Sequence, residues 1–273
     1  MEALLTLLVY LLVFWTGASI GSFLSVVVHR IPARLSIVQP PSHCPQCGYR
    51  LKFYENVPIL GWLSLKGRCS NCRTPISARY PLLEAGCGFV FVVIFALFGL
   101  TWQTVGYWMF FAWLLALSLI DIDTMTLPNP LTQWGLIAGL LFQALMGYAA
   151  TATLAGSIQQ LMQGLLGAVL GIWLVDVIAI VGGIAFGQDA MGGGDAKLAA
   201  MMGAWLGWQL LLLAGFLACA IGALGGGLAL GMGILSRRQA FPFGPFLALG
   251  GMIAAIWGNA IVSAYLQLFF PSL

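Results

Sequence analysis

Long apolar stretches alternate with short polar segments over most of the chain. The stretches run to about 17–28 residues, long enough for helices to cross a hydrocarbon core of about 30 Å. They lack the alternating polar and apolar positions of a membrane barrel. The pattern predicts an all-α polytopic membrane protein with about eight transmembrane helices, of which the sixth is short and the Gly207-Trp208 boundary the weakest. The predicted spans are 3–28, 82–100, 104–121, 131–149, 159–186, 196–208, 209–235 and 244–270.

One sizeable polar segment, residues 29–81, interrupts this pattern between the first and second spans. It contains prolines at 32, 40, 41, 45, 58, 75 and 81, which favours a small domain rich in loops. The chain therefore divides into a first transmembrane helix (1–28), a small polar domain (29–81) and a larger membrane domain (82–273).

The composition supports this class. Hydrophobic residues make up 61% of the chain and charged residues 7%, with a mean hydropathy of +0.99. A soluble domain carries roughly 25% charged residues, and a soluble fold could not hide so much apolar surface. We expect the lipid bilayer as the surroundings and no nucleic-acid partner.

The cations define an orientation. Eight of the 11 Lys and Arg residues lie in segment 29–81, and the others are Lys197, Arg237 and Arg238. With eight spans, all of these positions fall on one side of the membrane. The positive-inside rule assigns that side to the cytoplasm, and we expect a multi-pass protein of the cytoplasmic (inner) membrane.

The polar segment contains two CxxC motifs, which are 21 residues apart. Each CxxC turn can present two thiolates to one tetrahedral ion, so Cys44, Cys47, Cys69 and Cys72 predict a structural zinc site in a zinc-ribbon-like domain. Disulfides are one alternative, which a reducing cytoplasm disfavours. A redox CxxC is another, although one such motif would suffice for it. Cys87 and Cys219 lie in apolar runs and are interpreted as small buried hydrophobes.

The carboxylates are few, eight in the whole chain, and an ionisable group near a membrane span needs a reason. Asp121 ends the third span and Asp195 begins the sixth, so the topology places both at the cytoplasmic face. The glycines before Asp195 allow a close backbone approach. We expect Gly192, Gly194 and Lys197 to contact substrate.

Paired carboxylates suit peptide hydrolysis, because one ionised member can activate water while its protonated partner polarises the scissile carbonyl. Asp195 at a helix N-terminus and Asp121 near a helix C-terminus predict that Asp121 carries the shared proton at rest. Asp123 is interpreted as an interfacial cap, Asp189 as solvated, and Asp176 as a polar contact or part of a substrate path.

Two other classes of protein fit some of these residues. A membrane transferase could hold Mg²⁺ with Asp121, Asp123 and Asp195. A non-enzymatic transporter or scaffold could combine the zinc ribbon with a path lined by Asp176.

Several motifs resemble, in order, those of the type IV prepilin peptidases, the leader peptidases with N-methyltransferase activity. Proline stands seven residues after the first catalytic aspartate of that family, which selects Asp121, and the Gly-x-Gly-Asp signature selects Asp195. Ser25 and Asp189 depart from the family's usual Asn and Glu. Besides the cysteine pairs, the motifs are residues 21–32, 55–60, 79–84, 121–128, 191–198 and 241–246.

The resemblance implies an aspartyl endopeptidase that cuts leaders from prepilin or pseudopilin precursors after a glycine, at the cytoplasmic face. It also implies methylation of the new N-terminal residue with S-adenosylmethionine. We place that activity in the zinc-bearing segment, with Glu55 and Glu84 as candidates.

Overall fold

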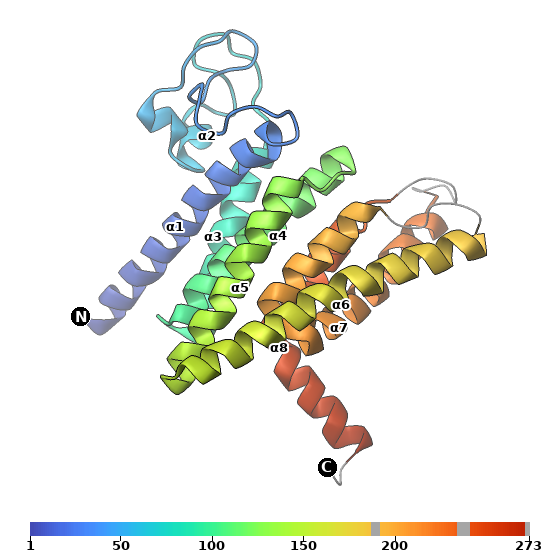
Figure 1. The fold of residues 1–273 in the computed structure, drawn as a ribbon. Coiled ribbons are helices and arrows are strands. Elements are labelled where there is room, and N and C mark those ends of the chain that lie inside the picture. Colours follow the sequence, from blue (N-terminus) through green and yellow to red (C-terminus); the bar gives the residue numbers. More distant parts are fainter. Residues whose placement is uncertain (187–191, 234–240, 271–273) are drawn as a thin grey trace. The chain divides into compact units, whose positions relative to one another are not determined.

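A computed structural model describes residues 1–186, 192–233 and 241–270. Two compact units, Met1–Ala112 and Trp113–Leu273, divide the chain inside helix α4 (Trp102–Thr124). The described residues are almost entirely helical (Figure 1). The two units are defined by which residues pack together and not by function. The predicted functional boundaries at residues 28 and 81 therefore stay a prediction. Asp189, Met191, Arg237 and Arg238 lie outside the described residues.

The first unit is built on two antiparallel helices, α1 (Glu2–Arg30) and α3 (Arg79–Phe98). Glycines bring their backbones together: a Cβ atom at Gly17 would lie 2.8 Å from the Cα of Gly88, and one at Gly21 would lie 2.9 Å from the Cα of Glu84. Small residues at a helix–helix contact are typical of membrane packing, where van der Waals contact replaces the hydrophobic effect.

The segment between α1 and α3 contains a short 3-10 helix, η1 (Phe53–Asn56), and one short helix, α2 (Leu60–Ser64). Each CxxC turn is closed by an isolated antiparallel bridge, His43 with Arg50 and Arg68 with Pro75. The fold class predicted from the sequence, an all-α membrane protein with a small cysteine-bearing domain between its first two spans, is therefore confirmed.

Seven helices of the described chain are long and apolar enough to cross a membrane, whereas the sequence predicts about eight spans. Six of the predicted spans correspond to single helices within a few residues. The predicted spans 196–208 and 209–235 are the two arms of one bent element, α7 (Gly193–Gly231), which meet at the non-helical Gly207, so the seven helices agree with the prediction of about eight spans. The other helices of the second unit are α5 (Asn129–Thr151), α6 (Leu154–Phe186), α7 (Gly193–Gly231) and α8 (Gly244–Phe269).

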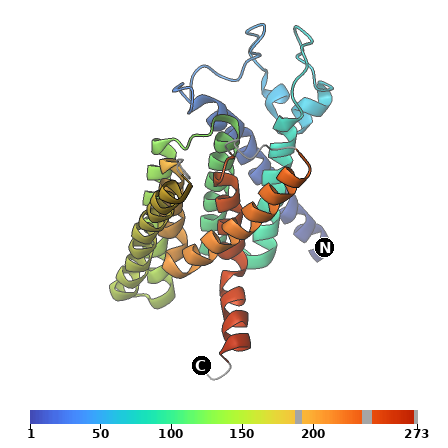
Figure 2. The same ribbon diagram turned by 90° about the vertical axis from the view of Figure 1, so that its right-hand side faces the viewer.

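Helix α7 is a bent element with two arms that meet at Gly207, whose φ of 75° and ψ of 171° are not helical. Only glycine adopts such a conformation without strain. The arms leave the bend in different directions (Figure 2). At the bend the carbonyl of Trp205 accepts a hydrogen bond from Gln143 Nε2 (3.0 Å), which supplies the partner that the interrupted helix lacks.

Contacts with α6 and α8 show that the two arms are antiparallel. Along the first arm, Gly171 of α6 faces Ala199 and Gly164 faces Ala204. Along α8, a Cβ atom at Gly251 would lie 2.6 Å from Met202 of the first arm, and one at Gly258 would lie 2.7 Å from Leu210 of the second. Phe246, near the start of α8, lies beside Gly222 and Gly225 of the second arm. The second arm thus returns towards the end of α8 from which the first arm starts.

Candidate functional site

Asp121 lies in the last turn of α4 and is only 6% exposed. Its Oδ2 accepts a hydrogen bond from the amide of Gly244, the first residue of α8, at 3.0 Å. Ile120 beside it is fully buried, as are Leu114 and Leu117 further along the same helix. Packing around α4 therefore places a carboxylate inside the protein, with a helix N-terminus as its hydrogen-bond donor.

Asp195 lies in the first turn of α7 and is 9% exposed. Its backbone amide donates a hydrogen bond to the carbonyl of Gly192 at 3.0 Å. The carboxylate is close enough to Asp121 for their charges to interact. The structure thus brings together the two aspartates that are 74 positions apart in the sequence.

The other acidic residues near this site are arranged differently. Asp123 is exposed, although it is only two residues from the buried Asp121, because adjacent positions on a helix turn to different sides. Asp176 is exposed on α6, and a role for it in a substrate path stays a prediction. Among the described residues, the one cluster of three or more metal-ligating side chains is formed by cysteines and includes neither aspartate.

The three residues predicted to contact substrate lie at the start of α7. Lys197 is exposed, and its Nζ donates a 2.7 Å hydrogen bond to Asn129 Oδ1 at the start of α5. Gly192 is exposed, with no atom within 4 Å of the place of a Cβ. Gly194 is half-buried, and a Cβ atom there would lie 3.1 Å from Leu127. Lys197 therefore links two helix starts, and contact with substrate stays a prediction.

The role of Gly244 was not predicted from the sequence. Motif 241–246 was recognised only as a resemblance, and a glycine has no side chain to suggest a role. The prediction that Asp121 carries the shared proton at rest took into account only the C-terminus of the helix in which Asp121 lies. Asp121 also accepts a hydrogen bond from the N-terminus of α8, and this favours its ionised form. The position of Asp121 at the end of its own helix is therefore not enough to assign the proton.

The four cysteines of the polar segment form a compact cluster. Their Sγ atoms all lie within 4.8 Å of one another, with Cys44 and Cys72 3.7 Å apart and Cys47 and Cys69 4.0 Å apart. Four sulfurs at about 2.3 Å from a tetrahedral zinc ion would be about 3.8 Å apart. The cluster fits a tetrahedral ion with all four positions taken by protein.

Hydrogen bonding favours the thiolate form at one of these four cysteines, Cys72. A hydrogen bond with Thr74 lowers the pKa of Cys72 to about 6, and the two side chains are 3.2 Å apart. Of the other two cysteines, Cys87 is fully buried, as predicted. Cys219 is exposed on α7, so its predicted burial was wrong. An apolar run on a membrane helix need not turn every residue to a protein neighbour.

Two buried carboxylates shape the rest of the small domain. Glu55, 7% exposed, accepts the amide of Lys52 at 2.8 Å, and this hydrogen bond holds the pKa of its carboxyl below the ordinary value. Glu84, 8% exposed, accepts the amide of Ile59 at 2.6 Å. Both carboxylates bind backbone amides, which favours a role in holding the domain together.

Removal of the Glu84 carboxylate should therefore loosen the turn that begins α2. Ile59 has a φ of 60°, which is unusual for a β-branched residue, and Glu84 holds its amide there. We expect Glu84→Ala to destabilise this turn by about 1.5–3 kcal/mol, the contribution of a hydrogen bond to a charged group. Hydrogen exchange of residues 57–64, followed by mass spectrometry, measures the loss.

Two further variants test the explanation for Glu84. Glu84→Gln keeps an acceptor oxygen and should have a smaller effect than Glu84→Ala. Ile59→Gly removes the backbone strain and should reduce the effect of Glu84→Ala in the double variant. Equal exchange in the wild type and Glu84→Ala would show that the hydrogen bond does not hold the turn.

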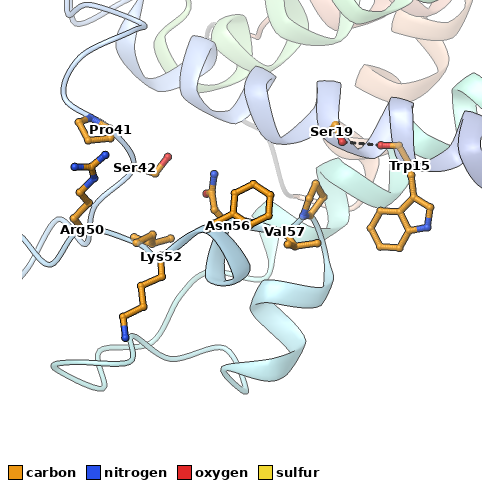
Figure 3. A pocket seen from close by; sticks show the side chains of 11 residues that line it. Trp15, Ser19, Pro41, Ser42, Arg50, Lys52, Asn56 and Val57 are labelled. Carbon is orange, nitrogen blue, oxygen red and sulfur yellow. Dashed lines mark hydrogen bonds between the residues drawn. The ribbon is translucent and has the colours of Figure 1, made fainter.

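A cavity of about 660 Å³ lies between α1 and the loop that leads to η1 (Figure 3). Its walls combine the aromatic rings of Trp15 and Phe53 with the polar side chains of Ser42 and Asn56. The ammonium of Lys52 lies over the ring of Tyr54, 5.8 Å from its centroid, and Arg50 contributes a cationic side chain to the lining. The remaining lining residues are Ser19, Pro41, Leu51, Val57 and Pro58.

Two family models match the chain. The model described as the bacterial Peptidase A24 N-terminal domain matches residues 15–98, which include the cysteine cluster and the cavity. The model described as the type IV leader peptidase family matches residues 108–227, which include Asp121 and Asp195. The two matches follow the same order as the two compact units.

Curated proteins named prepilin leader peptidase/N-methyltransferase align with nearly the whole chain. The protein of Stutzerimonas stutzeri is 36% identical over 92% of this chain and 91% of its own length. The protein of Aeromonas hydrophila is 35% identical over 96% and 95%, and that of Pseudomonas aeruginosa 36% identical over 92% and 91%. No solved structure matches. The chain belongs to the type IV leader peptidase family.

Proposed function

We propose that the protein is an aspartic endopeptidase of the bacterial inner membrane that removes the leader from type IV prepilins or pseudopilins. One observation carries this proposal: two buried carboxylates, from helices distant in sequence, lie close together in one site. The names of the relatives supply the substrate class. Cleavage after a glycine follows from the resemblance of the sequence motifs.

The carboxylate pair accounts for hydrolysis without a further group. The ionised aspartate takes a proton from water, whose oxygen adds to the scissile carbonyl carbon, while the protonated aspartate gives its proton to the carbonyl oxygen. When the C–N bond breaks, the proton held by the first carboxylate passes to the leaving amine, and a hydroxyl of the intermediate returns its proton to the second carboxylate. Repulsion between two nearby carboxylates keeps one of them protonated, which is the form this chemistry needs.

The positions of the cations support a cytoplasmic active site. Eight of the 11 cations lie in segment 29–81, and Lys197 lies two residues after Asp195. The positive-inside rule assigns such cation-rich segments to the cytoplasm. The two arms of α7 are antiparallel, so its two ends can lie on the same side of the membrane, as the predicted orientation requires.

Leader cleavage of a purified precursor tests the peptidase directly. The detergent-solubilised full chain should convert a prepilin to a shorter product, with the new N-terminus read by mass spectrometry. The rival transferase predicts loss of activity on chelation and its return with Mg²⁺ alone. Exposed Asp123 and buried Asp121 do not form such a site, so we expect added Mg²⁺ to have no effect. An uncut precursor would contradict the proposed function.

We also propose that the first unit carries N-methylation and that S-adenosylmethionine binds in its cavity. The volume of about 660 Å³ lies within the range of about 300–1,000 Å³ typical of small-molecule sites. Arg50 can pair with a carboxylate, and Trp15 and Phe53 offer faces for an adenine ring. The bound donor supplies an activated methyl group, and the residues of the cavity bind and orient it.

Arg50→Ala should weaken binding of S-adenosylmethionine to the full chain by at least about tenfold, because a charge-assisted hydrogen bond contributes about 1.5–3 kcal/mol. Equilibrium dialysis with labelled donor measures this without any turnover. Arg68→Ala is the matched control, since Arg68 is exposed in the same segment but does not line the cavity. Unchanged binding by Arg50→Ala would place the donor elsewhere.

We propose that the cysteine cluster holds a structural zinc ion. The spacing of the sulfurs fits tetrahedral coordination, and four protein ligands leave no open position for catalysis. The segment contains few buried apolar residues, so a metal supplies stability that its core does not.

A further inference from the structure

We propose that the first turn of α8 is the third structural element of the active site, and that Gly244 is a positioning residue for Asp121. This inference rests on the proposed function, because it concerns the geometry of the same carboxylate pair. Gly244 is buried and donates its amide to Asp121 Oδ2 at 3.0 Å. The bond joins residues 123 positions apart in the chain.

Position 244 has no space for a side chain. A Cβ atom there would lie 2.6 Å from Asp121 Oδ2, 3.1 Å from its Cγ and 3.4 Å from its Cβ. The atom in the way is the carboxylate oxygen itself, so any side chain at 244 would displace the group that does the chemistry. Glycine is thus required by the close approach of the backbone to Asp121 rather than by a left-handed conformation.

The amide of Gly244 is held in place independently of Asp121. Phe243 caps the start of α8, and its carbonyl accepts the amides of Phe246 and Leu247 at 3.0 and 3.1 Å. The ring of Phe246 packs against α7, where a Cβ atom at Gly225 would lie 3.3 Å from it. The first turn of α8 is therefore anchored on the second arm of α7.

This anchoring connects both aspartates to one element. The first arm of α7 carries Asp195, and the second arm supports the turn whose amide holds Asp121. Their mutual placement thus depends on the bend at Gly207 and on the start of α8. One oxygen of Asp121 is occupied by the Gly244 amide, so its carboxylate has a defined orientation, and its other oxygen remains for chemistry.

Gly244→Ala should lower kcat for leader cleavage by about 100-fold, because a displacement of about 1 Å at a catalytic group has an effect of that size. The KM for the precursor should stay within about twofold, because the contact is with Asp121. A substitution that only loosened the fold would change both constants and the unfolding temperature. Gly226→Ala is the matched control, since nothing lies within 4 Å of its Cβ position, and it should retain wild-type kcat.

A second measurement covers the case in which Gly244→Ala unfolds. The new methyl group meets Asp121, so Asp121→Ala should remove the conflict, and the double variant should unfold at a higher temperature than Gly244→Ala alone. An equal loss of stability in both backgrounds would overturn the inference. So would a wild-type kcat in Gly244→Ala.

The outcomes separate this inference from the proposed function. If Asp121→Asn and Asp195→Asn still cleave the precursor, the proposed function fails. If both are inactive and Gly244→Ala cleaves like the wild type, the function stands and the positioning role is lost.

Discussion

Replacement of Asp121 or Asp195 by asparagine is expected to slow leader cleavage by on the order of 10⁴-fold or more, the scale seen when a member of a catalytic unit is removed. Asparagine has nearly the same shape as aspartate but neither takes a proton from water nor gives one to a carbonyl. Both carboxylates are buried in one site, so no solvated group can replace them. Cleavage of a purified precursor under single-turnover conditions measures the effect.

The double variant is as informative as the single ones. If the two carboxylates act as a unit, the combined substitution should lower the rate no further than either substitution alone. Asp123→Asn is the matched control, because Asp123 is exposed two residues away on the same helix, and its rate should stay within about twofold of the wild type. Loss of activity in Asp123→Asn with recovery in Mg²⁺ would instead support a metal-dependent transferase.

Removal of the metal from the cysteine cluster is the second large expected effect. Structural zinc contributes about 10–16 kcal/mol in small zinc domains at neutral pH. Cys44→Ser combined with Cys72→Ser takes one sulfur from each CxxC turn, so the bound zinc should fall from one ion per chain to none. Residues 31–78 should then be cut rapidly by trypsin, which their many cations make sensitive. Elemental analysis and limited proteolysis measure the two results.

The two activities should respond differently to zinc loss. The cavity lies in the same unit as the cysteines, whereas Asp121 and Asp195 belong to the other compact unit. Binding of S-adenosylmethionine should therefore fall in proportion to the zinc content. The rate of leader cleavage should fall by a smaller fraction. Cys219→Ser is the control, since this exposed thiol lies outside the cluster. Full protease resistance of the double variant without zinc would contradict a structural metal.

Much of the fold follows from local rules that a sequence displays. A span must be long and apolar, and a CxxC turn needs only its own few residues, so the helices and the cysteine cluster could be predicted. Asp121 and Asp195 could be paired because each lies at the end of a span, where direction alone decides the side of the membrane. These inferences require no knowledge of which helices touch.

Contacts between elements that are distant in the chain could not be predicted from these local patterns. Gly244 meets Asp121 through its backbone, and no residue pattern records where a main-chain amide points. Gly207 was recognised as a break, but apolar windows do not distinguish a loop outside the membrane from a bend supported by Gln143. The engagement of Glu84 with Ile59 likewise depends on a turn that folds back onto α3.

The bend in α7 has a consequence for how the protein is inserted into the membrane. The first arm has 14 residues before Gly207, about 21 Å of helix, which is less than the hydrocarbon core of about 30 Å. Nearly all of its residues after Asp195 are covered by neighbouring helices, so the arm is never required to be soluble in lipid. A helix this short does not span the hydrocarbon core by itself, so the first arm takes its place in the bilayer only against α5 and α6, which precede it in the chain.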